Sequence, residues 1–340
     1  MRRLLIIIGT LVLIAGFWLL IFQYASLFRT TEDPTTPIPH ANIEIQIPDP
    51  EPIASSLRIL FTGDLMLDRG VKYYIEKIGG GDYTFPFTKI KSYLDSFDVV
   101  IPNLEGPISD KGVKAGSIYS FRMDPKVFEA FSYANIRAVN VANNHAWDYG
   151  RVAFEDTLRR LKEDNIGYFG GGISEAEAYA PHILEKDGVR VGILGFTEFL
   201  EHAQADGDGG GIAFTDMEKI KSAIRNTKTN AIDALIVVYH FGEEYIPEPI
   251  VRQVDLARFA IDEGADLVVG HHPHVVESSE IYKERQIFYS LGNFIFDQSF
   301  SKETMTPGFL EVTVSTLGIE SALLKRGSMT QYYEVIPPVE

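Results

Sequence analysis

Five short aliphatic runs in this chain each stop at a side chain that can bind a metal ion or move a proton. In α/β proteins such runs are usually parallel strands, and ligands gather in the crevice beyond the carboxyl ends of these strands. Five segments that are distant in the sequence are therefore predicted to converge on one site. The side chains are Asp64, Glu105, Asn144 with His145, His240, and the histidines His271, His272 and His274.

The sharpest local signal is the loop Gly270-His271-His272-Pro273-His274, which follows the aliphatic run 267–269. Three imidazoles so close together have few structural uses, and Pro273 stiffens the loop so that His272 and His274 can be presented together. Neutral imidazole is a common ligand for zinc, manganese and iron. The motif therefore favours a metal site over a set of surface histidines that are hydrogen-bonded to the backbone.

The second signal is Asn143-Asn144-His145, which is followed by Asp148 and Gly150. An asparagine amide oxygen can ligate a hard metal ion while the adjacent histidine, held just off the metal, donates a proton to a leaving group. The competing interpretation is turn chemistry, because asparagine is common in tight turns. The pairing of Asn144 with His145 favours a functional site.

Two carboxylates, Asp64 and Glu105, each follow an aliphatic run after a short spacer. A carboxylate directly after a buried strand and a glycine can serve as a metal ligand, or it can cap the next helix. Both interpretations stay open for Asp64. Glu105 is similar, although glutamate is a weaker helix cap than aspartate.

His240 ends the run 235–239, where a single histidine is more often a buried core residue than a ligand. The polar residues that follow it, among them Glu244 and Tyr245, favour a site. Asn293 lies in a Gly-Asn turn after a predicted strand. It either lines the pocket or only makes the turn.

Alternating β and α signals continue nearly to the end of the chain and predict an α/β fold. Asp124 is expected to cap the first predicted helix, and Gly264 is expected to end the last one. Two strands joined by a turn at 316–318 predict a hairpin and hence a mixed sheet. The helices are expected over 125–134, 152–163, 216–227 and 250–263, and the other strands over 166–169, 182–184, 189–196, 286–289, 309–315 and 319–324.

The composition limits the classes of function. With 340 residues, 45% of them hydrophobic, the chain can bury a core of full domain size, as one large domain or two smaller ones. It has no cysteine, which excludes thiolate metal sites and a thiol nucleophile. The net charge of −16 argues against nucleic acid as a partner. An anionic substrate would need a local cation, which a metal ion could supply.

The N-terminus predicts a membrane anchor. After Arg2 and Arg3 comes an uncharged apolar stretch over 4–22, which is long enough to cross a bilayer as one helix. It could also be a cleavable signal, but no small-residue cleavage pattern follows it. We expect an anchor at 1–28, a Pro/Thr-rich linker at 29–56 and one domain at 57–340. The two arginines should stay in the cytoplasm, so we expect a single-pass protein of the cell membrane with an extracytoplasmic domain.

Six blocks of sequence together carry a family resemblance. The blocks are Gly63-Asp64-Leu65-Met66-Leu67-Asp68-Arg69, Asn103-Leu104-Glu105, Asn143-Asn144-His145 with Asp148 and Gly150, His240-Phe241-Gly242-Glu243-Glu244-Tyr245, 270–274 and 290–296. In their order and spacing they resemble the CapA family, named for poly-γ-glutamate capsule synthesis, whose domain is related to calcineurin-like metallophosphoesterases. The resemblance covers roughly residues 57–324. It implies a four-layer α/β/β/α sandwich, metallophosphoesterase-like, with the metal-type residues at one edge.

The resemblance also implies roles for single residues. The metal ligands would be Asp64, Glu105, Asn144, His240, His272 and His274. His145 would donate a proton, with Asp148 as the other catalytic residue. Whether His271 or His272 is the ligand stays open, as do the number of ions and the choice among manganese, zinc, iron and magnesium. The residues expected to contact substrate are Arg69, Asn143, Glu244, Tyr245, His271 and Asn293.

The sequence departs from the metallophosphoesterase pattern at two positions. The first block usually has Asp-x-His, whereas Met66 stands at the third position here, and Glu105 stands where aspartate is usual. A thioether is a poor ligand for hard divalent ions. The resemblance therefore does not by itself imply phosphoesterase activity.

Two functions follow as hypotheses. The first is a membrane-anchored CapA-like protein that assists synthesis, export or surface attachment of poly-γ-glutamate or a related anionic polymer, beside other membrane-bound capsule synthesis subunits. The second is a metal-dependent hydrolase of phosphoester, acyl or amide bonds that uses metal-activated water. A lesser third hypothesis is a degenerate fold that only binds its ligand.

Overall fold

A computed structural model describes residues 55–207 and 209–339 of the chain, and these residues confirm the mixed α/β class. The predicted anchor at 1–28 and nearly all of the predicted linker lie outside the described residues. Within the described ranges, no helix combines the length and apolar character needed to cross a membrane.

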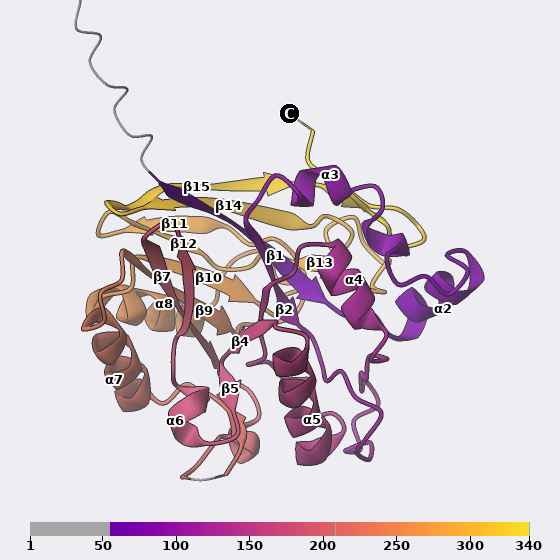
Figure 1. Cartoon of the computed structure of the whole chain (residues 1–340), viewed down its shortest axis with the longest axis horizontal. Helices are drawn as coiled ribbons and strands as arrows, with labels where there is room; N and C mark the ends of the chain where they lie inside the picture. Colours follow the sequence, from indigo (N-terminus) through magenta and orange to yellow (C-terminus); the bar gives the residue numbers. More distant parts are fainter. Residues whose placement is uncertain (1–54, 208, 340) are drawn as a thin grey trace, which may run out of the picture. The chain divides into compact units, whose positions relative to one another are not determined.

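The described residues form two large sheets (Figure 1). The first has the strand order β15-β14-β1-β2-β3-β4, with β13 beside β1. Strands β1 to β4 are mutually parallel, whereas β14 and β15 form the predicted antiparallel hairpin, in which Ser315 pairs with Gly318. The strands are β1 (Ser56–Leu65), β2 (Val99–Leu104), β3 (Ala138–Asn140), β4 (Gly167–Phe169), β13 (Asn293–Ile295), β14 (Gly308–Ser315) and β15 (Gly318–Arg326).

The second sheet has the order β11-β12-β10-β9-β7-β6. Its four central strands are parallel, and the two edge strands β6 and β11 pair antiparallel with their neighbours. The strands are β6 (His182–Lys186), β7 (Val189–Thr197), β9 (Ala234–His240), β10 (Leu267–His271), β11 (Ser279–Tyr282) and β12 (Arg285–Phe288). Two short pairs lie outside these sheets: β5 (Gly171–Gly172) with β8 (Gly211–Ile212), and β16 (Ser328–Met329) with β17 (Val335–Ile336).

Side chains from both sheets share one buried core, so the sheets pack face to face. Ile59 and Phe61 of β1 lie in this core with Ile193 of β7 and Val238 of β9. Leu60, between Ile59 and Phe61, points to the other face of its sheet, as the two-residue period of a strand requires. The apolar runs of the sequence are continuous because both faces of these strands are buried.

Helices cover the two outer faces. The core on the outer face of the first sheet includes residues of α2 (Arg69–Lys77), α3 (Lys91–Leu94), α4 (Val127–Tyr133) and α5 (Gly150–Glu163). The core on the outer face of the second sheet includes residues of α6 (Glu175–Ala178), α7 (Met217–Lys228) and α8 (Val251–Glu263). Two 3₁₀ turns complete the elements, at Phe85–Phe87 and Glu201–Ala203. The layers therefore run helices, sheet, sheet, helices (Figure 1).

The boundaries of the four predicted helices agree with the structure to within two residues. The Asp216 side chain accepts hydrogen bonds from the backbone N–H groups of Glu218 and Lys219 at the start of α7, and Gly264 ends α8 with a φ of 123°. The helix predicted from 125 begins only at Val127. Its expected cap, Asp124, instead accepts from the Lys126 N–H at 3.0 Å and makes a turn before the helix.

Strand register brings the polar residues of the five runs to one edge of the fold. Asp64 of β1 pairs with Asn103 of β2, which pairs with Asn140 of β3, and His240 of β9 pairs with His271 of β10. Backbone packing is very close at this edge. A Cβ on Gly63 would lie 1.9 Å from the Gly292 carbonyl oxygen, so only glycine fits directly before Asp64.

The loop after β10 also carries a buried acid, Glu277, which accepts a hydrogen bond from Gln253 Nε2 of α8 at 2.7 Å. The Ile250 N–H donates to Gln253 Oε1, which fixes the amide with its NH₂ toward the carboxyl group. Burial raises the pKa of Glu277 to about 8. Folded protein therefore keeps the proton to higher pH than unfolded protein does.

We predict that this acid makes folding stability fall as pH rises. Above the ordinary pKa of 4.5 the unfolded chain releases the proton, while the folded chain keeps it up to about pH 8. Glu277→Gln keeps the acceptor and removes the titration. Between these two pH values, the free energy of unfolding of Glu277→Gln should rise relative to that of wild type by up to about 1.4 kcal/mol per pH unit. Urea unfolding of both proteins from pH 5 to 8 measures the difference, and a constant difference would contradict the assignment.

Candidate metal centre

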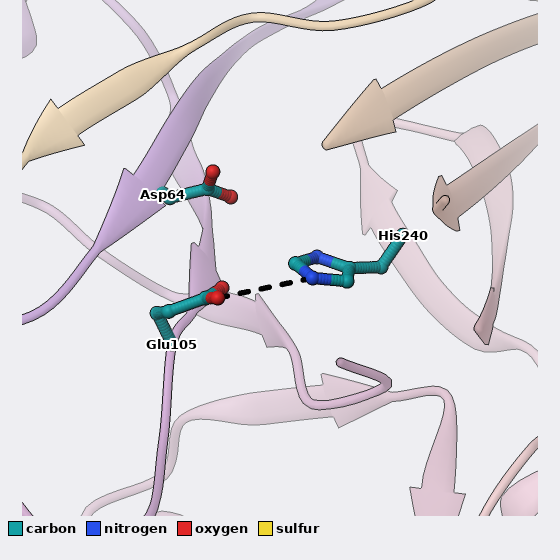
Figure 2. A group of neighbouring side chains, drawn as sticks. All are labelled: Asp64, Glu105 and His240. Carbon is teal, nitrogen blue, oxygen red and sulfur yellow. Dashed lines mark ion pairs between the residues drawn. The ribbon is translucent and has the colours of Figure 1, made fainter. Parts of the chain in front are cut away.

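Three buried side chains from both sheets converge at the shared edge. Asp64 lies near the end of β1, Glu105 directly follows β2, and His240 is the last residue of β9. Each offers a ligand atom, and these atoms all lie within 4.8 Å of one another. Figure 2 shows the two carboxylates facing the imidazole across the gap between the sheets, with Glu105 Oε1 3.8 Å from His240 Nε2.

The other predicted ligands surround this group. Asn144 Oδ1 lies 2.8 Å from His240 Nε2, and His274 Nδ1 lies 3.1 Å from Asp64 Oδ2. The His272 ring lies 4.9 Å from the His240 ring, measured between centroids. The fold therefore brings together all six residues that the sequence predicted as ligands.

The histidine loop adopts an uncommon backbone to do this. His272 and His274 have φ angles of 103° and 59°, in the left-handed region that side chains with a Cβ rarely occupy. Such conformations persist only where surrounding contacts enforce them, and they concentrate at functional sites. Asn293 provides one of these contacts, because its Oδ1 lies 2.9 Å from His274 Nδ1.

Burial decides the charges of the group. It raises the pKa of Glu105 well above the usual range, and the negative charge of Asp64 adds to this effect. Burial also acts to raise the pKa of Asp64, but the hydrogen bond and charge of His274 outweigh it, so this pKa lies below its usual value. Burial lowers the pKa of His240 well below the ordinary range and that of His271 to about 4. His240 and His271 are thus neutral at pH 7, the state in which imidazole binds metals.

The donor set fits a divalent metal ion. Glu105 Oε1 and His272 Nδ1 are buried and have no hydrogen-bond partner in the part of the chain that the structure describes. Unpartnered buried polar atoms are costly, and a cation would satisfy both. Carboxylate, amide and imidazole donors suit manganese, zinc and iron. Met66 is no part of this set, because its Sδ accepts from the Asp68 N–H at 3.2 Å.

His145 is oriented beside the carboxylates by Asp148. His145 Nδ1 lies 2.7 Å from Asp148 Oδ2, and the Phe121 N–H donates to the same oxygen at 2.7 Å. His145 Nε2 lies 4.0 Å from Glu105 Oε1. A histidine held through one nitrogen by a carboxylate can exchange a proton through the other. The pair therefore has the geometry that its predicted catalytic role needs.

A pocket of about 520 Å³ opens over the centre. Six residues from the predicted site line it, together with aromatic side chains from two other loops. Its lining residues are Arg69, Asn144, His145, Glu244, Tyr245 and His274, with Ser117, Tyr119, Phe121, Phe296, Asp297, Gln298 and Phe300. A larger hollow of about 700 Å³ beside α6 and α7 contains none of the predicted site residues.

Three residues predicted to contact substrate do not line the pocket. Asn143, His271 and Asn293 are each at most 1% exposed. Asn143 donates to the Leu104 carbonyl and accepts from the His145 N–H, and Asn293 holds His274 as described above. Asn143 and Asn293 thus hold neighbouring groups of the centre. Their predicted contact with substrate, and that of His271, stays a prediction.

Two further contacts at the centre and its pocket were not expected from the sequence. Asn103 donates from Nδ2 to Asp64 Oδ1 at 2.8 Å and to Glu105 Oε2. Asp297 accepts from Arg69 Nε at 3.1 Å and from the Gly70 N–H at 3.0 Å. The position of Asn103 two residues before Glu105 was a usable signal, because alternate strand residues share a face. No spacing rule joins Arg69 to Asp297 across 228 residues.

Comparison with known proteins finds one family whose model spans the residues of the centre. The family described as bacterial capsule synthesis protein PGA_cap matches residues 58–298. The capsule biosynthesis protein CapA of Bacillus anthracis is 36% identical over 255 residues, which cover 72% of this chain and 61% of the relative. The PGA biosynthesis protein CapA of Bacillus subtilis (strain 168) is 35% identical over 249 residues, covering 71% and 64%. The chain thus spans somewhat more than three fifths of the length of these curated relatives.

A solved structure of a phosphatase from Mycoplasma pneumoniae aligns with 81% of this chain and 94% of its own, with a TM-score of 0.48 and 14% sequence identity. The TM-score and the sequence identity of this match are both low.

We predict that Glu105 is required for metal binding. Glu105→Gln keeps the shape of the side chain but removes the charge that would neutralise a divalent ion. Changes behind a metal ligand already cost about 10–100-fold in affinity, so loss of the charge should weaken Mn²⁺ binding by more than about 100-fold. Isothermal titration calorimetry measures this.

Glu311→Gln is the matched control, because Glu311 lies on β14 and pairs with Lys325 at 2.9 Å, apart from the centre. It should bind Mn²⁺ as wild type does. Equal affinities for wild type and Glu105→Gln would refute the assigned ligand set.

Proposed function

Because the chain belongs to the bacterial capsule synthesis family PGA_cap, we propose that it assists the synthesis, export or surface attachment of poly-γ-glutamate or a related anionic polymer. The observation that carries the proposal is the family match over residues 58–298, which contains every residue of the metal centre and of its pocket except Phe300. The Bacillus relatives are named for capsule and PGA biosynthesis, which supports the same polymer class.

A divalent ion explains how a strongly acidic protein could hold an anionic polymer. The net charge of −16 repels polyanions from the general surface. A metal ion beneath the pocket would reverse this locally, and Arg69 adds a cation at the pocket wall, 5.2 Å above the Phe121 ring. Glu244 and Asp297 line the same pocket, so the site would favour a polymer segment with donors as well as carboxylates.

The proposed setting is the outer face of the cell membrane. The apolar stretch within 1–28 would anchor the chain, and the Pro-rich segment 29–56 would hold the domain away from the bilayer. Other membrane-bound capsule synthesis subunits would then be natural partners.

A second candidate is a metal-dependent hydrolase of phosphoester, acyl or amide bonds. The observation that favours it is the oriented His145–Asp148 pair with Nε2 facing the carboxylates, because polymer binding alone needs no proton donor. A bound ion would supply Lewis-acid chemistry. His145 would release its proton from Nε2 to the leaving group, while Asp148 holds Nδ1. Pocket residues Arg69 and Tyr245 would orient the substrate.

We predict that polymer production depends on the acids of the metal centre. In a polymer-producing strain lacking this gene, wild type and Glu311→Gln should restore cell-bound polymer, whereas Asp64→Asn should not, because the ion would lose a charged ligand. Quantifying cell-bound and released polymer tests this. Unchanged polymer in the deletion strain would count against the capsule role.

His145→Ala separates the two candidate functions in the same assay. If the centre performs hydrolysis, His145→Ala should fail as Asp64→Asn does while still binding Mn²⁺. Full restoration by His145→Ala would rule out a proton-donating role and leave metal-dependent polymer binding.

A further inference from the structure

Asn103 is fully buried between the strand ends, and its amide contacts both carboxylates of the proposed metal centre. It pairs with Asp64 on one neighbouring strand and with Asn140 on the other. Its Oδ1 accepts from Asn140 Nδ2 at 3.0 Å and from Asn143 Nδ2 at 3.3 Å. The amide therefore has its oxygen toward other amides and its nitrogen toward the acids.

Backbone groups fix this orientation. The Ala142 N–H donates to Asn140 Oδ1, and the His145 N–H donates to Asn143 Oδ1. A backbone N–H can only donate, so both flanking side chains must turn their NH₂ groups away from these contacts. Both NH₂ groups then meet Asn103 Oδ1, and a reversed Asn103 would set donors against donors.

The Asn103 NH₂ group has two hydrogens and three neighbouring acceptors. Asp64 Oδ1 lies at 2.8 Å and Glu105 Oε2 is closer still, whereas His240 Nδ1 is 3.3 Å away. Hydrogen bonds to carboxylate oxygens are the stronger ones. The two hydrogens are thus taken by one oxygen of each acid.

The remaining oxygen of each acid faces the histidines. Glu105 Oε1 has no hydrogen-bond partner among the described residues and lies 3.8 Å from His240 Nε2. Asp64 Oδ2 lies 3.1 Å from His274 Nδ1. Each carboxylate therefore has one oxygen held by an amide of the protein and one oxygen presented to imidazoles from the opposite sheet.

We propose that Asn103 is a positioning residue. Its NH₂ group hydrogen-bonds to one oxygen of each carboxylate, so that the other oxygens, Asp64 Oδ2 and Glu105 Oε1, bind the metal ion. The inference rests on the proposed metal centre and deepens it by naming the ligand oxygens. Held in this way, each acid binds through one oxygen and is prepared before the ion arrives. In metal-free protein the same amide offsets the repulsion between the two acids.

A crystal structure of the full-length chain loaded with Mn²⁺ tests the assignment. Anomalous scattering should place the ion against Asp64 Oδ2 and Glu105 Oε1, with Asn103 Nδ2 still hydrogen-bonded to Asp64 Oδ1 and Glu105 Oε2. An ion on either of the latter two oxygens, or a displaced Asn103, would overturn the inference but leave the metal centre standing. Absence of an ion at this edge would overturn both.

Titration in solution tests the same role without crystals. Asn103→Ala should weaken Mn²⁺ binding by about 10–100-fold, as loss of other groups behind metal ligands does. Thr227→Val is the control, because Thr227 is buried in α7 and its hydroxyl donates only to the Ala223 carbonyl. It should lose stability but keep wild-type affinity. Equal affinity of Asn103→Ala and wild type would overturn the inference.

Asn103→Asp is the alternative variant if Asn103→Ala does not fold. It keeps the shape of the side chain and its accepting oxygen, but a carboxylate oxygen replaces the NH₂ donor. Without the amide donor the variant should bind Mn²⁺ more weakly, so a given Mn²⁺ concentration should raise its thermal midpoint less than it raises that of wild type. An equal or larger rise would overturn the proposal.

Discussion

Two carboxylates buried side by side, Asp64 and Glu105, are the constraint around which this fold is arranged. A buried charge is tolerated only when it is paired, hydrogen-bonded or bound to a metal. The protein meets part of this demand itself, since Asn103 donates to both acids and His274 lies beside Asp64. One oxygen of Glu105 still has no hydrogen-bond partner within the described residues. A buried acid with an unpartnered oxygen destabilises a core, but the same oxygen is available to bind a cation.

Each of the two sheets supplies a different kind of side chain to the centre. The first sheet supplies the acids and the buried amides from the ends of β1, β2 and β3, and the second supplies the imidazoles from β9 and the loop after β10. Neither sheet could assemble the group alone. The apolar core between the sheets therefore also sets the distance between acids and imidazoles. His145, held by Asp148 at the rim of this group, connects the buried centre to the pocket above it.

The sequence was enough to predict which side chains gather at this edge, because they follow aliphatic runs and parallel strands place the ends of such runs together. It also predicted the hairpin β14–β15, the position of α7 and the end of α8 at Gly264. It could not separate residues that line the pocket from residues buried behind it, because the asparagines Asn143, Asn144 and Asn293 have the same chemistry and differ only in how deeply they are buried. The role of Asn103 depends on the register between β1 and β2, and the pairing of Arg69 with Asp297 depends on tertiary packing. Neither leaves a local signature.

The proposed centre requires a metal ion held jointly by acids and imidazoles. X-ray absorption spectroscopy of the full-length chain with one equivalent of Zn²⁺ tests this most directly, because imidazole rings give multiple-scattering features that carboxylate and water do not. We expect a mixed oxygen and nitrogen shell that contains imidazole. A shell of oxygen alone would contradict it, since the ion would then be bound outside the group formed by the two sheets.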